Sequence, residues 1–231
     1  MGGRFTGWPE QAYDVLLKLE GDPPMAVRES VRDERERLVR QPMVALMQDL
    51  ADADACYRKF VVPSLGLTLW PWQRQVGFVR AERNFDQRVW LDLDGMYVEA
   101  CWWMFNPGSY TSPWREAYMT AVADDTSGPE LVGIVETLRQ QGYDLGGEQL
   151  ERIPKSYPGD HPRALLLRDA DHPRAGLLRH RSLVAGRHLG SENWLHKPEA
   201  ADRVLAAFEE LRPMASWFAD HVPGDAHRYP S

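Results

Sequence analysis

The sequence predicts an α+β fold, in which a small and mostly antiparallel sheet packs against N-terminal, middle and C-terminal helices. Three observations favour this class. Apolar residues recur at helical spacing over residues 12–50 and again over 201–211. Residues 88–104 instead alternate in the manner of strands. Asp94-Gly95 interrupts this alternation and favours a hairpin, which makes the two flanking strands antiparallel.

Prolines open the predicted helices of the N-terminal third. Pro9 begins a helix that ends at Gly21. A charged helix is expected over 25–39, and Pro42 restarts the helical pattern, which continues to Leu50. This third of the chain is therefore predicted to be helical.

The predicted sheet is built around residues 56–104. A short strand is expected at 57–62, and the hairpin joins 88–93 to 96–104 through a tight turn of the primed type at Asp94-Gly95. Short extended segments near 143–153 and 183–187 complete the sheet. On the second hairpin strand, alternation places Glu99 on one face with Tyr97, Cys101 and Trp103.

Helices are predicted over 113–122, 129–141 and 198–211, and Pro213 ends or kinks the last of them before a segment over 215–222. Between the middle and last helices, residues 160–168 and 171–179 match at eight of nine positions. Each copy begins Asp-His-Pro-Arg-Ala, which is typical of a helix start. Proline disfavours helical geometry in the residue before it, so we expect two short helices.

Composition excludes several classes of protein. The mean hydropathy of −0.49 and an aromatic content of 10% argue against both a membrane protein and a disordered one. Cys56 and Cys101 form neither a disulfide framework nor a metal-binding spacing, which predicts a protein of the reducing cytoplasm. No cofactor is expected, because the sequence carries no phosphate loop and no dinucleotide fingerprint. The 231 residues fit a single domain, expected over 1–222 with a loose tail at 223–231. Oligomeric state is not readable from the sequence.

Charge and aromatic residues are unevenly distributed. Residues 152–187 hold eight basic and three acidic side chains, so this stretch carries +5 while the remainder of a chain of net charge −7 carries −12. An acidic protein with one basic stretch is a poor nucleic-acid binder, but the stretch can hold a single anionic group. Six of the nine tryptophans fall between residues 70 and 114: Trp70, Trp72, Trp90, Trp102, Trp103 and Trp114.

The second half of the chain carries a set of specific motifs. They are Ser127-Gly-Pro-Glu-Leu131, Leu138-Arg-Gln-Gln-Gly-Tyr-Asp-Leu-Gly-Gly147, Leu150-Glu-Arg-Ile-Pro-Lys-Ser-Tyr157, Trp194-Leu-His-Lys-Pro-Glu-Ala200 and Leu211-Arg-Pro-Met-Ala-Ser-Trp217. By these stretches the chain resembles the mostly bacterial family catalogued as domain of unknown function 2461, and the match is specific over residues 124–222. The resemblance implies a bacterial protein, but the family has no established activity to carry over.

The chain departs from the family pattern in two places. Family members usually carry a polar run containing Lys, Asp and His after a Tyr-Arg pair, whereas here Tyr57-Arg58 is followed by an apolar and aromatic run that ends at Trp72. On the second hairpin strand, Glu99-Ala-Cys-Trp-Trp103 stands where the family has several glycines and Tyr-Tyr. If the polar run forms the family's site, this member of the family has an apolar, aromatic site in its place.

Two hypotheses follow from these residues. The first is a cofactor-independent enzyme of specialised metabolism that acts on a bulky hydrophobic small molecule, with Glu99 as the acid or base. Burial of Glu99 would raise its pKa, whereas the alternative places it on a solvent-facing side of the sheet. The cavity walls would be Trp70, Trp72, Trp102 and Trp103, and an anionic handle would be held near Arg152, Lys155, Tyr157 and His161.

The second hypothesis is a non-catalytic small-molecule-binding or scaffold protein, whose tryptophans fill a core or meet a partner. No nucleophile elbow, phosphate loop or dinucleotide fingerprint supports a named reaction. The histidines, all after residue 160, lack the spacing of metal ligands, so neither hypothesis includes a metal.

Overall fold

The computed structural model describes residues 4–64, 71–80, 85–102, 113–149, 161–169 and 171–222. The chain forms two compact units, each assembled from several separate stretches. Unit 1 contains residues 1–80, 87–99 and 187–209. Unit 2 contains residues 81–86, 100–186 and 210–231. The predicted tail at 223–231 lies outside the described residues.

The strands form one six-stranded sheet in the order β1-β2-β3-β4-β6-β5, and with the helices it confirms the α+β class. β1 pairs antiparallel with β2, and β5 pairs antiparallel with β6, with Leu145 opposite Ala185. The strand bounds are β1 Phe60–Val61, β2 Gln75–Arg80, β3 Phe85–Asp92, β4 Gly95–Trp102, β5 Asp144–Gly146 and β6 Leu183–Gly190.

The predicted hairpin is β3 and β4, but its turn is one residue earlier than expected. The turn residues are Leu93 and Asp94, and Gly95 already belongs to β4 with φ +104°. The Asp92 carboxylate accepts a hydrogen bond from the Asp94 backbone N–H, which favours this earlier turn. Gly95 is required because a Cβ there would lie 2.4 Å from the carbonyl oxygen of Gly190.

Strand β2 is an element that the sequence patterns did not single out. Gly77 interrupts its β-branched and aromatic residues and so weakens the strand signal. The structure gives the reason for this glycine, since a Cβ at position 77 would lie 2.9 Å from the Met47 side chain. Gly77 therefore lets α4 approach the sheet closely.

The N-terminal helices belong to unit 1 and confirm the predicted helical third. Their bounds are α1 Gln11–Lys18, α2 Met25–Ser30, α3 Arg32–Arg35 and α4 Gln41–Ala53, with the π-helical turn η1 Glu36–Arg40 leading directly into α4. Pro42 is the second residue of α4, but Arg40 and Gln41 before it already have helical backbone angles, so the helix continues from η1 and does not begin at this proline. The 3₁₀ turn η2 Ala55–Tyr57 then precedes β1, so the strand predicted at 57–62 is shorter than expected.

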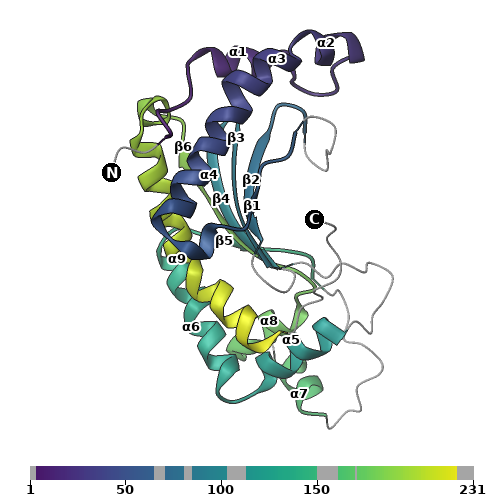
Figure 1. Cartoon of the computed structure of the whole chain (residues 1–231). Coiled ribbons are helices and arrows are strands. Elements are labelled where there is room, and N and C mark those ends of the chain that lie inside the picture. The colour runs from purple at the N-terminus through teal and green to yellow at the C-terminus, as the bar shows by residue number, and fades with distance from the viewer. Residues whose placement is uncertain are drawn as a thin grey trace. The chain divides into compact units, whose positions relative to one another are not determined.

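In unit 1, α4 and the first half of α9 lie along the strands (Figure 1). The buried Gln87 side chain of β3 donates a hydrogen bond of 2.7 Å to the carbonyl oxygen of Phe208 on α9. Tyr57 packs its ring edge-on against that of Phe208. The 3₁₀ turn η3 Asn193–His196 precedes α9. The backbone N–H of Trp8 donates a hydrogen bond to the carbonyl oxygen of Leu195 in this turn.

Helix α9 (Glu199–His221) contains Pro213 and continues through it. The prediction allowed this proline to end or kink the helix, and the observed helix does not end there. Residues 199–209 of α9 belong to unit 1 and residues 210–221 to unit 2.

Unit 2 contains α5 (Pro113–Ala123) and α6 (Ser127–Gln140), close to their predicted bounds. After α6, the Gly142 N–H donates to the Arg139 carbonyl and the Tyr143 N–H to the Leu138 carbonyl. These two bonds, with Gly142 at φ +85°, form a Schellman C-cap.

The duplicated segment forms two short helices in unit 2, α7 (Pro162–Arg168) and α8 (Pro173–Arg179), as predicted. Nδ1 of His161 accepts the N–H of Arg163, and Nδ1 of His172 accepts the N–H of Arg174, both at 3.2 Å. Each copy is thus capped by its histidine. Within the described residues, no helix is both long and apolar enough to cross a membrane.

Candidate functional site

A row of stacked side chains crosses the strands of unit 1. The short turn of the hairpin places Trp90 of β3 opposite Tyr97 of β4. Their rings stack with centroids 4.2 Å apart and planes inclined by 20°. His188 of β6 meets the other side of Tyr97 edge-on, at 4.8 Å between centroids.

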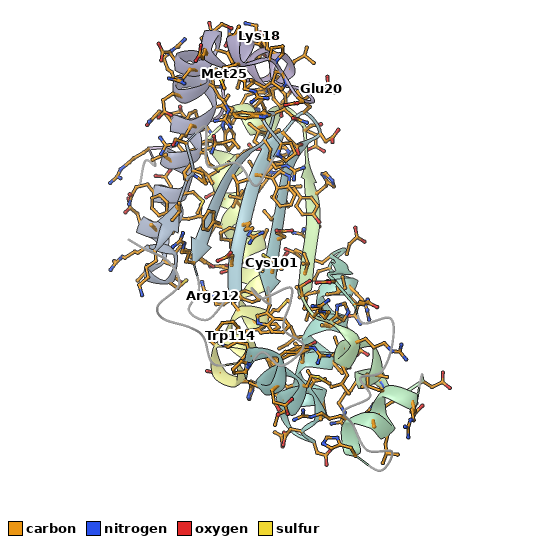
Figure 2. All side chains as sticks on the ribbon, turned by 90° about the vertical axis from the view of Figure 1, so that its right-hand side faces the viewer. Lys18, Glu20, Met25, Cys101, Trp114 and Arg212 are labelled. Carbon is orange, nitrogen blue, oxygen red and sulfur yellow. The ribbon has the colours of Figure 1, made fainter. Side chains whose placement is uncertain are left out.

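Arg74 continues this row beyond Trp90. Its guanidinium lies 4.6 Å from the centre of the Trp90 ring, a cation–π geometry. The same guanidinium pairs with the Asp92 carboxylate at 2.9 Å. We call Arg74, Trp90, Tyr97 and His188 the aromatic ladder; Figure 2 shows the described side chains of these strands with α9 behind them.

Glu99 and Arg88 form a second ion pair beside the ladder. Hairpin register places them opposite each other, two residues along each strand from Trp90 and Tyr97 and on the same face. Nη1 of Arg88 lies 3.3 Å from Oε1 of Glu99, and each side chain is only 12% exposed. The Glu99 side chain is therefore itself buried, although it lies on the same face of the sheet as the half-buried Trp90 and Tyr97. A buried carboxylate needs a compensating charge, and Arg88 supplies one that the sequence reasoning did not anticipate.

The Trp90–Tyr97 stack thus lies between two guanidinium–carboxylate pairs, Arg74–Asp92 on one side and Arg88–Glu99 on the other. Tyr13 is electrostatically linked to the first pair. Burial, with a smaller contribution from the charge of Asp92, raises the pKa of Tyr13 to about 12. The arrangement offers a ligand the exposed parts of two half-buried aromatic rings, together with charges held in fixed positions.

The residues predicted for the site belong partly to unit 1 and partly to unit 2, and several lie outside the described residues. Glu99 and Trp72 belong to unit 1, and Trp72 is covered by Arg28, whose guanidinium lies 4.0 Å from its ring centre. Trp102 and His161 belong to unit 2, where His161 caps α7. Trp70, Trp103, Arg152, Lys155 and Tyr157 lie outside the described residues.

Trp102 is a core residue of unit 2. Its ring is fully buried and stacks on Tyr118 at 4.6 Å and on Phe218 at 5.3 Å. For this tryptophan the structure favours the alternative in which the ring fills a core.

Sequence reasoning did not place Trp90, Tyr97, Arg74 and His188 in the site. A turn at Asp94-Gly95, as predicted, would pair Trp90 with Glu99, and only the observed turn at Leu93 and Asp94 places Trp90 opposite Tyr97. Arg74 and His188 carry no local signal, because they come from segments about 16 residues before and 98 residues after Trp90.

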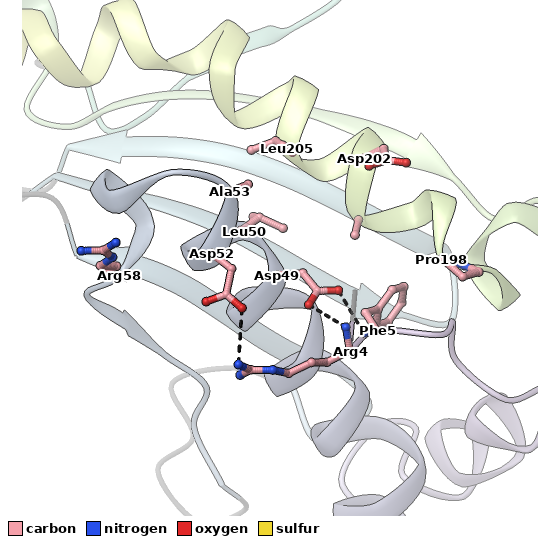
Figure 3. A pocket seen from close by; sticks show the side chains of 11 residues that line it. Arg4, Phe5, Asp49, Leu50, Asp52, Ala53, Arg58, Pro198, Asp202 and Leu205 are labelled. Carbon is pink, nitrogen blue, oxygen red and sulfur yellow. Dashed lines mark hydrogen bonds and ion pairs between the residues drawn. The ribbon is translucent and has the colours of Figure 1, made fainter. Parts of the chain in front are cut away.

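A separate cavity of about 780 Å³ opens in unit 1 between the end of α4 and the start of α9 (Figure 3). Phe5 and Leu50 provide buried apolar surface in its lining. The Asp49 carboxylate accepts hydrogen bonds from the backbone N–H groups of Arg4 and Phe5, at 2.8 and 2.9 Å. The remaining lining residues are Asp52, Ala53, Arg58, Pro198, Ala201, Asp202 and Leu205.

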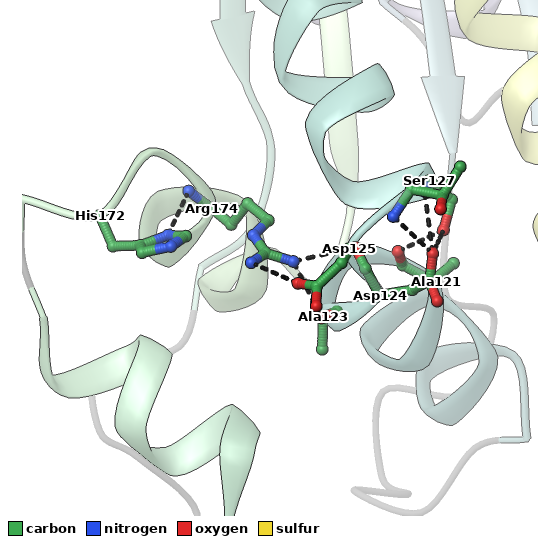
Figure 4. Close-up of polar contacts among 8 residues, drawn as sticks. Ala121, Ala123, Asp124, Asp125, Ser127, His172 and Arg174 are labelled. Carbon is green, nitrogen blue, oxygen red and sulfur yellow. Dashed lines mark hydrogen bonds and ion pairs between the residues drawn. The ribbon is translucent and has the colours of Figure 1, made fainter.

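In unit 2, a polar cluster joins α8 to the α5–α6 connection (Figure 4). The Arg174 guanidinium donates to the carbonyl oxygens of Ala123 and Asp124, both at 2.9 Å, and pairs with Asp125. The Asp124 carboxylate accepts the backbone N–H of Ser127 and of Thr126, which lowers its pKa below the ordinary value. This cluster caps the C-terminal end of α5 and the N-terminal end of α6, so its role is structural.

A metal centre finds no support in the described part of the chain, where no three His, Cys, Asp or Glu side chains are grouped so as to hold an ion.

Comparison with known proteins gives one match. Residues 89–217 match the model of the family described as "Conserved hypothetical protein (DUF2461)", which is more than half of the chain. No curated protein and no solved structure matches the chain.

Proposed function

This chain belongs to the DUF2461 family of conserved hypothetical proteins, and from that premise we propose that it is a cofactor-independent enzyme that binds a hydrophobic small molecule against the aromatic ladder of unit 1. Glu99 is the proposed acid or base. The observation that carries the proposal is the placement of the buried Arg88–Glu99 pair next to the Trp90–Tyr97 stack.

The ladder supports binding of an apolar or aromatic body. Trp90 and Tyr97 are half-buried, so they retain surface that a ligand can cover, and π faces also attract cationic groups. An anionic group on the ligand would be met by Arg74 or by the exposed His188. Arg152, Lys155 and Tyr157, which the sequence suggests for anion binding, belong to unit 2 and lie outside the described residues, so their role stays a prediction from the sequence.

The Arg88–Glu99 pair supports proton transfer. Arg88 holds the Glu99 carboxylate at a fixed position on β4, and a positioned carboxylate contributes about 10²- to 10⁴-fold to a reaction that needs a base. The proposed setting is the cytoplasm of a bacterium, in a pathway of specialised metabolism.

A non-catalytic binding protein is the second candidate. The observation that favours it is that Arg74 and His188 already occupy the two ends of the Trp90–Tyr97 stack, so that the ladder is complete without a reacting group. In this candidate Glu99 and Arg88 only hold β3 and β4 in register.

One experiment separates these candidates. A metabolite library is screened by intrinsic tryptophan fluorescence against the wild type and the Trp90→Phe variant, and each hit is then incubated with the wild type and the Glu99→Gln variant. The enzyme requires product formation that falls at least about 100-fold in Glu99→Gln while binding is retained. Binding without turnover in the wild type supports the second candidate. Hits whose fluorescence change is identical in Trp90→Phe rule out the ladder as the binding site.

A further inference from the structure

We propose that the cavity between α4 and α9 is a second binding site, distinct from the aromatic ladder, and that it takes a short zwitterionic peptide with apolar side chains. The cavity volume of about 780 Å³ lies within the range of small-molecule sites, roughly 300–1,000 Å³. A di- or tripeptide therefore fits this volume, whereas a single ion leaves most of it empty.

The lining has an apolar middle. Phe5 and Leu50 are almost fully buried and contribute apolar surface, and Leu205 and Ala201 of α9 line the cavity as half-buried residues. The small side chains of Ala53 and Ala201 leave the space open between the two helices. Apolar side chains of a peptide would cover this surface.

Two charged residues that line the cavity are not committed to other described residues. Asp49 accepts two backbone N–H groups, and Asp52 faces Arg4 at 3.4 Å. By contrast, the Arg58 guanidinium and the Asp202 carboxylate form no hydrogen bond or ion pair with any part of the chain that the structure describes.

These two free charges have opposite signs and come from different elements. Arg58 follows the 3₁₀ turn η2, whereas Asp202 lies in the first turn of α9 (Figure 3). The ligand that satisfies both carries an anion and a cation separated by an apolar body. In a peptide, the terminal carboxylate would pair with Arg58 and the terminal ammonium with Asp202.

The test is calorimetric titration of the wild type with the tripeptide Leu-Leu-Leu, with its N-acetylated form and with its C-terminal amide. Each modification removes one terminal charge and should weaken binding by up to about fivefold, since Arg58 and Asp202 are exposed and an exposed ion pair contributes at most about 1 kcal/mol. Arg58→Ala should remove the preference for the free carboxylate alone, and Asp202→Ala the preference for the free ammonium alone. Arg32→Ala and Asp33→Ala, two exposed positions on α3, serve as controls and should change neither preference.

Ala201→Phe fills the cavity and should abolish peptide binding. Thermal unfolding verifies that each variant is folded, and the variants leave the aromatic ladder untouched. The proposal is overturned if the wild type does not bind Leu-Leu-Leu, if it binds all three peptides equally, or if folded Ala201→Phe binds as the wild type does. Because these readouts do not involve Trp90 or Glu99, they succeed or fail independently of the proposed enzyme.

Discussion

Trp90 and Tyr97 stack face to face across adjacent strands, with ring centroids 4.2 Å apart. Stacked aromatic pairs contribute about 0.5–1.5 kcal/mol beyond the burial of their surface. We therefore expect a coupling energy of about 1 kcal/mol in a double-mutant cycle of Trp90→Leu and Tyr97→Leu, measured by urea unfolding. As the control, the cycle of Trp90→Leu with Ala206→Gly, an exposed position on α9, should give a coupling near zero. Equal couplings in both cycles would contradict a specific stack.

Trp102 should be needed for the stability of unit 2. Trp102→Ala removes a fully buried ring that stacks on Tyr118 and Phe218, so we expect a loss of about 3–5 kcal/mol in the free energy of unfolding. Trp102→Phe keeps an aromatic ring and should cost much less. It also removes a buried indole N–H that has no hydrogen-bond partner among the described residues. Urea unfolding measures both variants, and a Phe variant as unstable as the Ala variant would argue against this role.

The two copies of the duplicated segment hold the same helix, α5, at different positions. Arg163 of the first copy pairs with Glu116 and bonds Thr120, whereas Arg174 of the second copy binds the carbonyl groups at the end of α5. Arg174→Ala should therefore cost about 1 kcal/mol, because it leaves the partly buried Ala123 carbonyl without this donor.

Asp125→Ala is the matched control for Arg174. The Asp125 side chain is 96% exposed, so loss of its ion pair with Arg174 should change the free energy of unfolding by less than about 0.5 kcal/mol. Thermal unfolding of the two variants checks the difference. If both variants lose the same stability, the carbonyl contacts of Arg174 are not what stabilises α5.

His180 should make unit 2 less stable in mild acid. Burial lowers the pKa of His180 below its ordinary value of 6.5, and the ring bonds Ser182 and Gln149 as a neutral imidazole. The unfolded chain therefore binds one more proton than the folded chain between the folded-state pKa and 6.5. In that window the free energy of unfolding falls as the pH is lowered, by at most about 1.4 kcal/mol per pH unit.

Thermal unfolding between pH 7.5 and pH 5.5 measures this dependence. His180→Gln should give a shallower loss of stability on acidification than the wild type, whatever its stability at pH 7.5. His188→Gln, which alters an exposed histidine, should keep the steeper wild-type dependence. A slope unchanged by His180→Gln would contradict the prediction.

Much of the helical structure could be predicted because its signals are local. Pro9 and Pro162 mark helix starts, and Gly142 marks a helix end, each through the backbone geometry of a single residue. Pro213 was ambiguous for the opposite reason. Whether a helix continues through a proline depends on the packing on both sides of it, and packing is not a local property.

The candidate sites were harder to predict, because they depend on distant contacts. The turn at Leu93 and Asp94 was displaced by one side-chain hydrogen bond from Asp92, which no periodicity contains. The cavity joins Arg4 and Phe5 to Asp49 and to residues near 200, so no single stretch of sequence describes it. Glu99 was recognised as unusual, but its partner Arg88 follows only from the hairpin register.

The way the chain builds its two units limits how the protein can be divided. Unit 1 uses three stretches of chain and unit 2 uses the stretches between and after them. Neither unit can therefore be produced from one uninterrupted segment of the gene, and truncation at any position removes part of at least one unit. Separate expression of either unit would require its pieces to be rejoined by new linkers, whose lengths would have to be chosen against the folded structure.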